Sequence, residues 1–392
     1  MKTVLFTHPS AELYGADRTL IHAVRATQAA GRQAIVALPR RGQLAERLEA
    51  FGAKVVVREL GAALRKDLSP SRFASFLRKA RSGARAVNEL VEQHEVDLVH
   101  TNTSVLVGAA HGAGRAPVPH VWHVHEILDE PSWARRTMST LLHRWSDIVL
   151  ANSEATARAM TPRGAKNVRV LHNGFDAQRF QGKSFLDRAA LEDVHGIPSE
   201  QRLVVAPGRI NGWKGQRLLV EALGEARSAL GHVHVAFIGD PPSGQEHFLA
   251  ELESDIERLK LGGMVTIVPF TEELPSILRA ADLCVVPSTK PEPFGLVALE
   301  AMASGTAVLA AGHGGLIEIV ESGRTGELFI PGSARDLSER LVEMLASKSD
   351  LAQAGTNGRI RAETHFSLAA HEAGIVALHD ELLGIDRVRQ AA

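Results

Sequence analysis

Short apolar runs rich in β-branched residues alternate along the whole chain with longer stretches that have helical patterning. This alternation constrains the fold most, because strands separated by helices pair in parallel and form sheets covered by helices on both faces. We expect strands at residues 3–7, 34–38, 54–57, 97–101, 120–124, 147–151 and 168–171, and then at 203–206, 233–238, 265–268, 283–286, 307–310 and 327–330.

The strand pattern stops at a polar connection around residues 181–202 and then restarts. A chain of 392 residues also exceeds one typical hydrophobic core. We therefore predict an α/β protein with two Rossmann-like, doubly wound parallel-sheet domains facing across a cleft, at residues 1–183 and 184–366. The helical tail at about 367–392 is expected to pack back on the first domain. Neither first strand leads into G-x-G-x-x-G, which disfavours a nicotinamide dehydrogenase.

The single cysteine, Cys284, lies in an apolar run and is expected to be a buried core residue, which fits a reducing cytoplasm. The N-terminus lacks the long apolar segment of an export signal, and no apolar run approaches the length of a spanning helix. We expect a cytoplasmic protein that is neither exported by that route nor transmembrane.

A formal net charge of −1 hides a strong asymmetry between the two halves. Residues 1–183 hold 26 Lys/Arg against 16 Asp/Glu, whereas residues 184–392 hold 18 against 29. The segment 65–85 is the most basic and interleaves its charges with Leu68, Phe73, Phe76 and Leu77. It could contact anionic lipid headgroups, or it could be a solvated helix face with a small apolar seam. Nucleic acid is disfavoured, because no series of stacking aromatics accompanies the charges.

Two carboxylates eight residues apart, Glu292 and Glu300, flank a Pro-Phe-Gly turn. Gly295 permits a close backbone approach, and Leu296 should lie near a helix N-terminus, where free N–H groups favour a phosphate. Glu300, about one turn further, could accept hydrogen bonds from a ribose diol. Glu292 would lie beside the group that is attached to the phosphate. The alternative is that Glu near a helix start only complements the helix dipole, which contributes roughly 0.3–1 kcal/mol.

A glycine-punctuated loop follows the expected strand 203–206 and carries Gly208, Arg209 and Lys214. Loops after the strands of open parallel sheets are where ligands bind. A guanidinium fork and an ammonium point charge suit two adjacent phosphates, although both could be ordinary surface charges.

Two segments of the first half follow strands in the same way. Gly15 and Ala16, after the first strand, could approach the diphosphate from the other domain or form a simple turn. His123 and His125 share one face of the strand 120–124, whereas His120 points the other way, which disfavours a metal site. A histidine at a strand end could bond a sugar hydroxyl, or it could be structural.

Three further segments have less specific interpretations. Residues 151–154 are typical of a helix N-cap, and residues 172–176 of a turn. The glycine-rich residues 312–315 could line a sugar pocket or simply turn the chain. Ser288 and Cys284 lack a base in motif form, so a nucleophilic hydrolase has no support.

Together these residues resemble the retaining family 4 glycosyltransferases of the GT-B fold over most of the chain. Their E-x7-E element is matched by Glu292 and Glu300, with Phe294, Gly295 and Leu296 between them. Gly208-Arg209 and Lys214-Gly215 are similar to the family's G-R…K-G element, Tyr14-Gly15-Ala16 to its first loop, and Asn173-Gly174-Phe175-Asp176 to its interdomain N-G-V-D element.

The resemblance implies roles for these residues. Glu300 would bind ribose, Glu292 the donor sugar, and Arg209, Lys214 and the amides of residues 294–296 the diphosphate. The acceptor-side histidine would be His125, or His123 two residues earlier. Phe270 stands where many members have a Gly-rich turn at the base pocket, which leaves the nucleobase, UDP or GDP, open.

The implied reaction moves a sugar from a nucleoside diphosphate-sugar to a hydroxyl acceptor with retention and without a metal or cofactor. Its setting would be polysaccharide, glycolipid or other glycoconjugate assembly, with a possibly lipid-linked acceptor and a peripheral place at the inner face of the plasma membrane. Two alternatives share this architecture: a non-hydrolysing nucleotide-sugar epimerase and a catalytically silent nucleotide-sugar-binding subunit. No extra carboxylate motif supports the first, and the joint presence of His125, Arg209, Lys214, Glu292 and Glu300 argues against the second.

Overall fold

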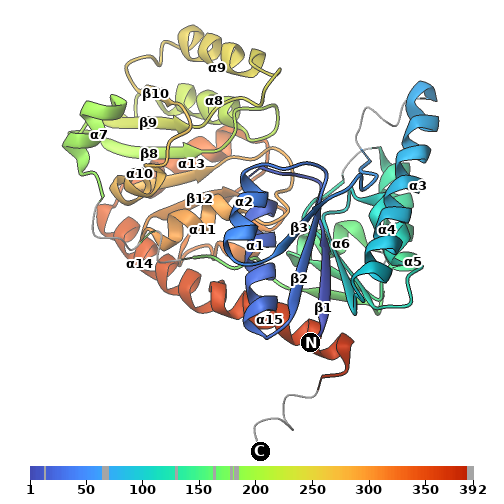
Figure 1. Ribbon diagram of the computed structural model, residues 1–392. Coiled ribbons are helices and arrows are strands. Elements are labelled where there is room, and N and C mark those ends of the chain that lie inside the picture. Colours follow the sequence, from blue (N-terminus) through green and yellow to red (C-terminus); the bar gives the residue numbers. More distant parts are fainter. Residues whose placement is uncertain are drawn as a thin grey trace, which may run out of the picture. The chain divides into compact units, whose positions relative to one another are not determined.

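The computed structural model describes residues 1–12, 15–63, 70–128, 131–161, 165–176, 180 and 185–385. The chain forms two compact units: Met1–Gly174 with Leu368–Ala392 (unit 1), and Phe175–Ser367 (unit 2). Each unit is a parallel sheet covered by helices, and Figure 1 labels most of the helices and several of the strands. The predicted fold class of two parallel-sheet α/β domains is confirmed.

Unit 1 contains a seven-stranded sheet with the order β3-β2-β1-β4-β5-β6-β7, and every neighbouring pair is parallel. Its strands are β1 (Thr3–Thr7), β2 (Gln33–Leu38), β3 (Lys54–Val57), β4 (Leu98–Asn102), β5 (His120–Val124), β6 (Ile148–Ala151) and β7 (Val168–Val170). Its helices are α1 (Gly15–Ala29), α2 (Gln43–Ala50), α3 (Pro70–Gln93), α4 (Val107–Ala113), α5 (Ser132–Trp145), α6 (Glu154–Met160) and α15 (Leu368–Leu383).

Alternate residues of β1 point to the two faces of this sheet, as the period of a strand requires. Val4 and Phe6 pack in a core with α1, α2 and α15, whereas Leu5 packs in another with α3 and α4. The C-terminal helix α15, red in Figure 1, packs against α1 and contributes Ile375 and Leu378 to the first core. The last helix of the chain is thus part of unit 1.

Unit 2 contains a six-stranded parallel sheet with the order β10-β9-β8-β11-β12-β13. Its strands are β8 (Arg202–Pro207), β9 (Val233–Ile238), β10 (Val265–Val268), β11 (Leu283–Val286), β12 (Ala307–Ala311) and β13 (Gly326–Phe329). Its helices are α7 (Arg188–His195), α8 (Gln216–Ala226), α9 (His247–Arg258), α10 (Leu274–Ala280), α11 (Leu296–Ala303), α12 (Leu316–Ile319), α13 (Ala334–Leu345) and α14 (Lys348–His365).

Each of the thirteen predicted strands overlaps a strand of the structure, with ends that differ by at most one residue. Local signals at two other sites are also confirmed. Ser153 caps α6, its side chain accepting a hydrogen bond from the Thr156 N–H at 2.9 Å. Cys284 on β11 is fully buried, and burial raises the pKa of its thiol.

Candidate functional site

Strand order places one switch point in each sheet, where successive connections leave in opposite directions. In unit 1 it lies between β1 and β4, and in unit 2 between β8 and β11. Open α/β sheets bind ligands outside the carboxyl ends of the strands at such points. The residues that follow these four strands are therefore the first place to look for a site.

In unit 2, the loop after β8 presents Lys214 through a local turn. Asn211 Oδ1 accepts hydrogen bonds from the backbone N–H groups of Trp213, at 3.1 Å, and Lys214, at 3.0 Å. Such side-chain-to-backbone bonds fix a turn without secondary structure. The Lys214 ammonium lies 4.6 Å from the centre of the Trp213 ring. Loop and side chain are thus both held in place.

Lys214 forms an ion pair with Glu292, the loop residue that follows β11. Lys214 Nζ donates to Glu292 Oε1 at 2.6 Å, and Ser288 Oγ donates to the same oxygen at 2.5 Å. The side chains of Lys214 and Glu292 are 16% and 7% exposed. A sheltered ammonium ion held on one side by a carboxylate is ready to contact an anion on its other side.

Glycines hold the two loops of this site together. Gly215 has a φ of +79°, and a Cβ there would lie 1.8 Å from the Pro287 carbonyl oxygen. Gly314 has a φ of +62°, and its Cβ would lie 2.4 Å from the Glu292 carbonyl oxygen. The Gly315 N–H donates to that same oxygen at 2.8 Å. Gly314 and Gly315, in the predicted 312–315 loop, therefore pack against the Glu292 backbone and support it.

The helix α11 begins at Leu296, as predicted, with Gly295 as its N-cap residue at a φ of +117°. No side chain caps this helix end. Phe294 is buried in the unit 2 core. The first N–H groups of a helix have no partner within the helix and attract anions, so the start of α11 has the geometry that a phosphate site requires.

The remaining predicted donor residues lie along the same edge of the sheet. Gly208 directly follows β8 at a φ of +149°, and Arg209 beside it is exposed. Phe270 follows β10 with its side chain 71% exposed, and its N–H donates to Asp240 Oδ2 at 3.2 Å. Glu300 is half-buried within α11. Gly208, Arg209 and Phe270 thus follow carboxyl ends of strands in unit 2, whereas Glu300 lies about one turn inside α11.

In unit 1, the switch point carries a chain of polar side chains that the sequence did not reveal. His8 Nε2 lies 2.5 Å from Asp17 Oδ1, and His8 Nδ1 lies 2.9 Å from Asn102 Nδ2. Asn102 Oδ1 lies 2.8 Å from His125 Nε2. These four buried residues, which we name the His125 chain, connect α1 with the ends of β1, β4 and β5.

A second set of buried groups, the His123 chain, lies behind the first. His123 Nδ1 is 3.3 Å from His100 Nε2, and His100 Nδ1 is 3.1 Å from His379 Nε2 on α15. His379 Nδ1 is 3.5 Å from Thr27 Oγ1. The His123 and His125 rings are 4.0 Å apart, so these residues share a face as predicted.

Burial keeps these imidazoles neutral, because it disfavours the charged form. It lowers the pKa of His125 to about 3 and that of His379 to about 3. The pKa values of His100 and His123 also lie well below the ordinary value, chiefly because both rings are buried. His120 points to the other side, where it contacts the Trp145 carbonyl and Thr101 Oγ1.

The carboxylate next to His125 is tied to the end of β4. Glu126 Oε2 accepts from the Ser104 N–H at 3.0 Å and from Ser104 Oγ at 2.9 Å. Burial raises the Glu126 pKa. This contact fixes the backbone where His125 leaves the strand.

The first loop is only partly described. Tyr14 lies outside the described residues, and α1 begins at Gly15. The Ala16 carbonyl accepts from Asn102 Nδ2 at 3.4 Å, so this loop contacts the His125 chain. Of the basic segment, Arg65, Lys66 and Leu68 lie outside the described residues. Its described basic side chains on α3 are exposed: Arg78, Lys79, Arg81 and Arg85.

Sequence reasoning missed His8, Asp17, Asn102 and Ser288. A partial signal existed, because His8 and Asn102 stand at the ends of β1 and β4. These two positions predict a contact only if β1 and β4 are known to be neighbours in the sheet, and the sequences of the two strands do not show this.

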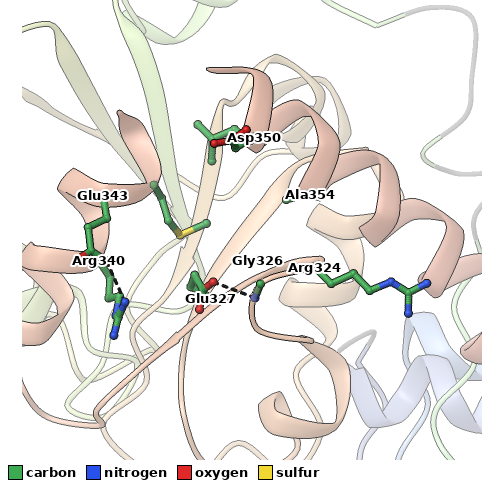
Figure 2. Close-up of a pocket in the computed structure, with 10 residues that line it drawn as sticks. Arg324, Gly326, Glu327, Arg340, Glu343, Asp350 and Ala354 are labelled. Carbon is green, nitrogen blue, oxygen red and sulfur yellow. Dashed lines mark hydrogen bonds and ion pairs between the residues drawn. The ribbon is translucent and has the colours of Figure 1, made fainter. Parts of the chain in front are cut away.

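A separate cavity of about 240 Å³ lies among β13, α13 and α14 (Figure 2). Glu327 and Arg340 line it, and Glu327 Oε1 accepts from the Gly323 N–H at 2.8 Å. This cavity sits by the amino end of β13, whereas Lys214 and Glu292 lie beyond carboxyl ends of strands. It is not the candidate site.

Two features are absent from the described part of the chain. Within it, no three His, Cys, Asp or Glu side chains come together in a way that could hold a metal ion. No described helix has the length and apolarity to cross a membrane.

Comparison with known proteins supplies relatives for both units. The family described as "Glycosyl transferases group 1" matches residues 187–361, and "Glycosyltransferase Family 4" matches residues 14–179. Anabaena HepE, crystallised with UDP and with UDP-glucose, is 28% identical with a TM-score of 0.81, over 97% of this chain and all of that one. Sucrose-phosphate synthase of Thermosynechococcus elongatus, 20% identical over 98% of this chain and 100% of that one, has a TM-score of 0.78 and so shares the fold.

Curated relatives match over shorter regions. A sulfoquinovosyl transferase of Arabidopsis thaliana is 31% identical over 67% of this chain and 52% of its own length. A D-inositol 3-phosphate glycosyltransferase of Mycolicibacterium smegmatis is 32% identical over 64% of this chain and 54% of its own. The chain thus spans about half the length of these two relatives. The two family matches, which together cover most of the chain, and the GT-B neighbours show that it belongs to the family 4 glycosyltransferases.

Proposed function

We propose that this protein is a retaining glycosyltransferase that moves a sugar from a nucleoside diphosphate-sugar to a hydroxyl acceptor. The observation that carries the proposal is the sheltered Lys214–Glu292 pair at the β8–β11 switch point, next to the uncapped start of α11. A cation and free helix N–H groups together suit a diphosphate, and a carboxylate beside them suits the sugar it carries.

Each donor contact follows from the chemistry of the residue. Lys214, Arg209 and the amides of residues 294–296 would hold the diphosphate, with Gly208 allowing its close approach. Glu292 would bind the sugar, and Glu300 the ribose hydroxyls. Phe270 would offer an exposed ring for the base, because base faces stack on aromatic side chains. On the acceptor side we assign His125, with Gly15 and Ala16 in the loop beside it.

The reaction needs no protein nucleophile in this proposal. The bond from the anomeric carbon to the phosphate oxygen breaks, the acceptor oxygen bonds to that carbon from the same face, and the acceptor proton passes to the departing phosphate oxygen. Negative charge grows on the diphosphate in the transition state, so Lys214 stabilises that state more than the bound donor. Retention is tested by NMR of the new glycosidic bond, and an inverted anomer would contradict it.

A UDP-sugar is the first donor to test, because the similar Anabaena protein was crystallised with UDP and UDP-glucose. The experiment is incubation with UDP-glucose, and with GDP-mannose in parallel, without any acceptor. Slow release of free sugar would support the transferase. An altered but intact donor would instead support epimerisation, and no turnover of any donor in a wider panel would support a silent binding subunit.

The acceptor class rests on the exposed basic side chains of α3 and on the positive charge of the N-terminal half. We propose a lipid-linked or otherwise anionic acceptor in glycoconjugate or polysaccharide assembly, reached at a cytoplasmic membrane face. Cosedimentation with vesicles containing anionic phospholipid at low salt is the expected result, since salt screens such contacts. No cosedimentation at low salt would contradict the membrane part alone.

A further inference from the structure

The His125 chain has a fixed direction, because the Asp17 carboxylate and the Ala16 carbonyl, which it contacts, can only accept hydrogen bonds. The Asp17 carboxylate, 2.5 Å from His8 Nε2, accepts hydrogen bonds, so His8 carries its proton on Nε2. An amide nitrogen only donates, so His8 Nδ1 accepts from Asn102 Nδ2 at 2.9 Å. The proton position on His8 thus follows from its partner.

Asn102 transmits this direction to β5. Its Nδ2 also faces the Ala16 carbonyl at 3.4 Å, and a carbonyl can only accept. The amide is therefore oriented with Oδ1 toward His125, and His125 Nε2 donates to it at 2.8 Å. Since a neutral imidazole carries one N–H, His125 Nδ1 must be an acceptor.

His125 Nδ1 is buried and has no hydrogen-bond partner among the described residues. A buried acceptor left unmet costs about 1–3 kcal/mol. A buried acceptor of this kind calls for a functional or structural explanation, such as a donor supplied by a bound molecule.

The neighbouring His123 chain has the opposite sense. Thr27 Oγ1 donates to the Ala23 carbonyl at 2.8 Å, so it can only accept from His379 Nδ1. His379 Nε2 then accepts from His100 Nδ1, and His100 Nε2 from His123 Nδ1. His123 Nε2 is left as an acceptor, which is also buried and without a described partner.

We propose that the two chains lock His123 and His125 in opposite tautomers, so that both adjacent rings present lone pairs and recognise a hydroxyl donor rather than an anion. Asp17, His8 and Asn102 are then positioning residues for His125. The inference rests on the proposed function, because it gives the acceptor-side histidine its chemistry. Two neutral acceptors suit a sugar or polyol O–H and disfavour a phosphate or carboxylate oxygen.

The direct test is a long-range ¹H–¹⁵N correlation spectrum of the full-length protein labelled with ¹⁵N-histidine. We expect a pyridine-like Nδ1 and a pyrrole-like Nε2 for His125, and the reverse pattern for His123. Loss of peaks in His123→Gln and His125→Gln assigns them. A pyrrole-like Nδ1 on His125 would overturn the proposal, whatever reaction the protein catalyses.

A matched pair of variants tests the consequence for activity. In His125→Asn the amide oxygen can take the place of Nδ1 and accept, whereas in His125→Gln the amide lies nearer the Nε2 position. With UDP-glucose hydrolysis as the assay, His125→Asn should keep at least about 10-fold more kcat/KM than His125→Gln, about 1.4 kcal/mol. Equal loss in both, or the opposite order, would contradict the acceptor role of Nδ1.

Asn102→Leu tests the positioning role. It should lower kcat/KM about 10- to 100-fold, the usual effect of losing a residue that orients a functional histidine, and should give His125 a mixture of tautomers. His120→Gln is the control, because His120 is buried on the same strand but faces away. An unchanged His125 spectrum in folded Asn102→Leu protein would overturn the positioning role. If no donor is hydrolysed, the proposed function fails. The spectrum still tests the tautomers of His123 and His125 in that case.

Discussion

The two sheets share one strand order but equip their switch points with opposite chemistry. At the β8–β11 point the main side chains are charged, with Lys214 held by Glu292 and left partly accessible. At the β1–β4 point the imidazoles of His100, His123 and His125 are buried, and burial favours their neutral form. The shared fold therefore offers the same place for a ligand in both units, and we propose that the side chains set whether an anion or a hydroxyl is recognised there.

The largest expected effect comes from removing the Lys214 ammonium group at the β8–β11 switch point. Lys214→Ala should lower kcat/KM about 10²- to 10³-fold, because the growing charge on the diphosphate loses a fixed donor. Stability should fall by about 1–3 kcal/mol, since Glu292 loses one of its two described donors. Kinetics with UDP-glucose and urea unfolding measure the two effects.

Lys348→Ala is the matched control, because Lys348 is exposed at the start of α14, away from the switch point. Its kinetics should equal those of the wild type. A Lys214→Ala enzyme with wild-type kinetics would contradict the diphosphate assignment.

The next largest effect, on stability, concerns the contact of Gly314 with the Glu292 backbone. Gly314→Ala combines a left-handed φ with a Cβ 2.4 Å from a backbone oxygen, and should cost about 3 kcal/mol or more. Gly244→Ala has a similar φ of +78° with nothing within 4 Å, and should cost only about 1–2 kcal/mol. Equal unfolding free energies for the two variants would show that Gly314 does not pack closely against the Glu292 backbone.

The sequence allowed every strand to be predicted, because a buried parallel strand is a local run of apolar residues flanked by helical patterning. The helix start at Leu296 was equally local. The Lys214–Glu292 contact could not be predicted from spacing, since its partners are 78 residues apart and meet only because β8 and β11 are neighbours.

The His125 chain could not be predicted from the sequence for the same reason. His8 and Asn102 are 94 residues apart and meet where β1 pairs with β4. The His379–His100 contact spans 279 residues and depends on α15 packing in unit 1. Local patterns predict elements, whereas strand order decides which polar side chains meet.

Acidification should destabilise unit 1, because its buried histidines at the β1–β4 switch point are neutral in the folded protein. Burial lowers the folded-state pKa of His379 to about 3, so at pH below about 6.5 the unfolded chain binds a proton that the folded chain does not. Unit 1 should therefore lose about 1.4 kcal/mol per pH unit for each such histidine as the pH falls from about 6.5 toward 3.

This dependence can be followed in a Trp213→Phe background, in which the remaining tryptophans, Trp122, Trp133 and Trp145, all lie in unit 1. Urea unfolding at pH 6.5, 5.5 and 4.5 gives the slope. His379→Gln should reduce that slope by about one proton. An unchanged slope would mean that His379 is protonated in the folded protein.

The smallest effect is expected at the exposed edge of unit 2. Phe270→Ala should raise the KM for UDP-glucose several-fold, toward the lower end of the roughly 1–3 kcal/mol that base stacking contributes, with little change in stability. Ile330→Ala, which removes another exposed apolar side chain (64% exposed), should leave KM unchanged. A KM unaffected by Phe270→Ala would place the base elsewhere.

The central proposal is that Lys214 holds a nucleoside diphosphate at the β8–β11 switch point. Isothermal titration of UDP into the wild type and Lys214→Ala tests this most directly. We expect one saturable site in the wild type, with affinity at least about 10-fold lower in the variant, consistent with a lost charged hydrogen bond of about 1.5–3 kcal/mol. Equal affinity in the two proteins would contradict it.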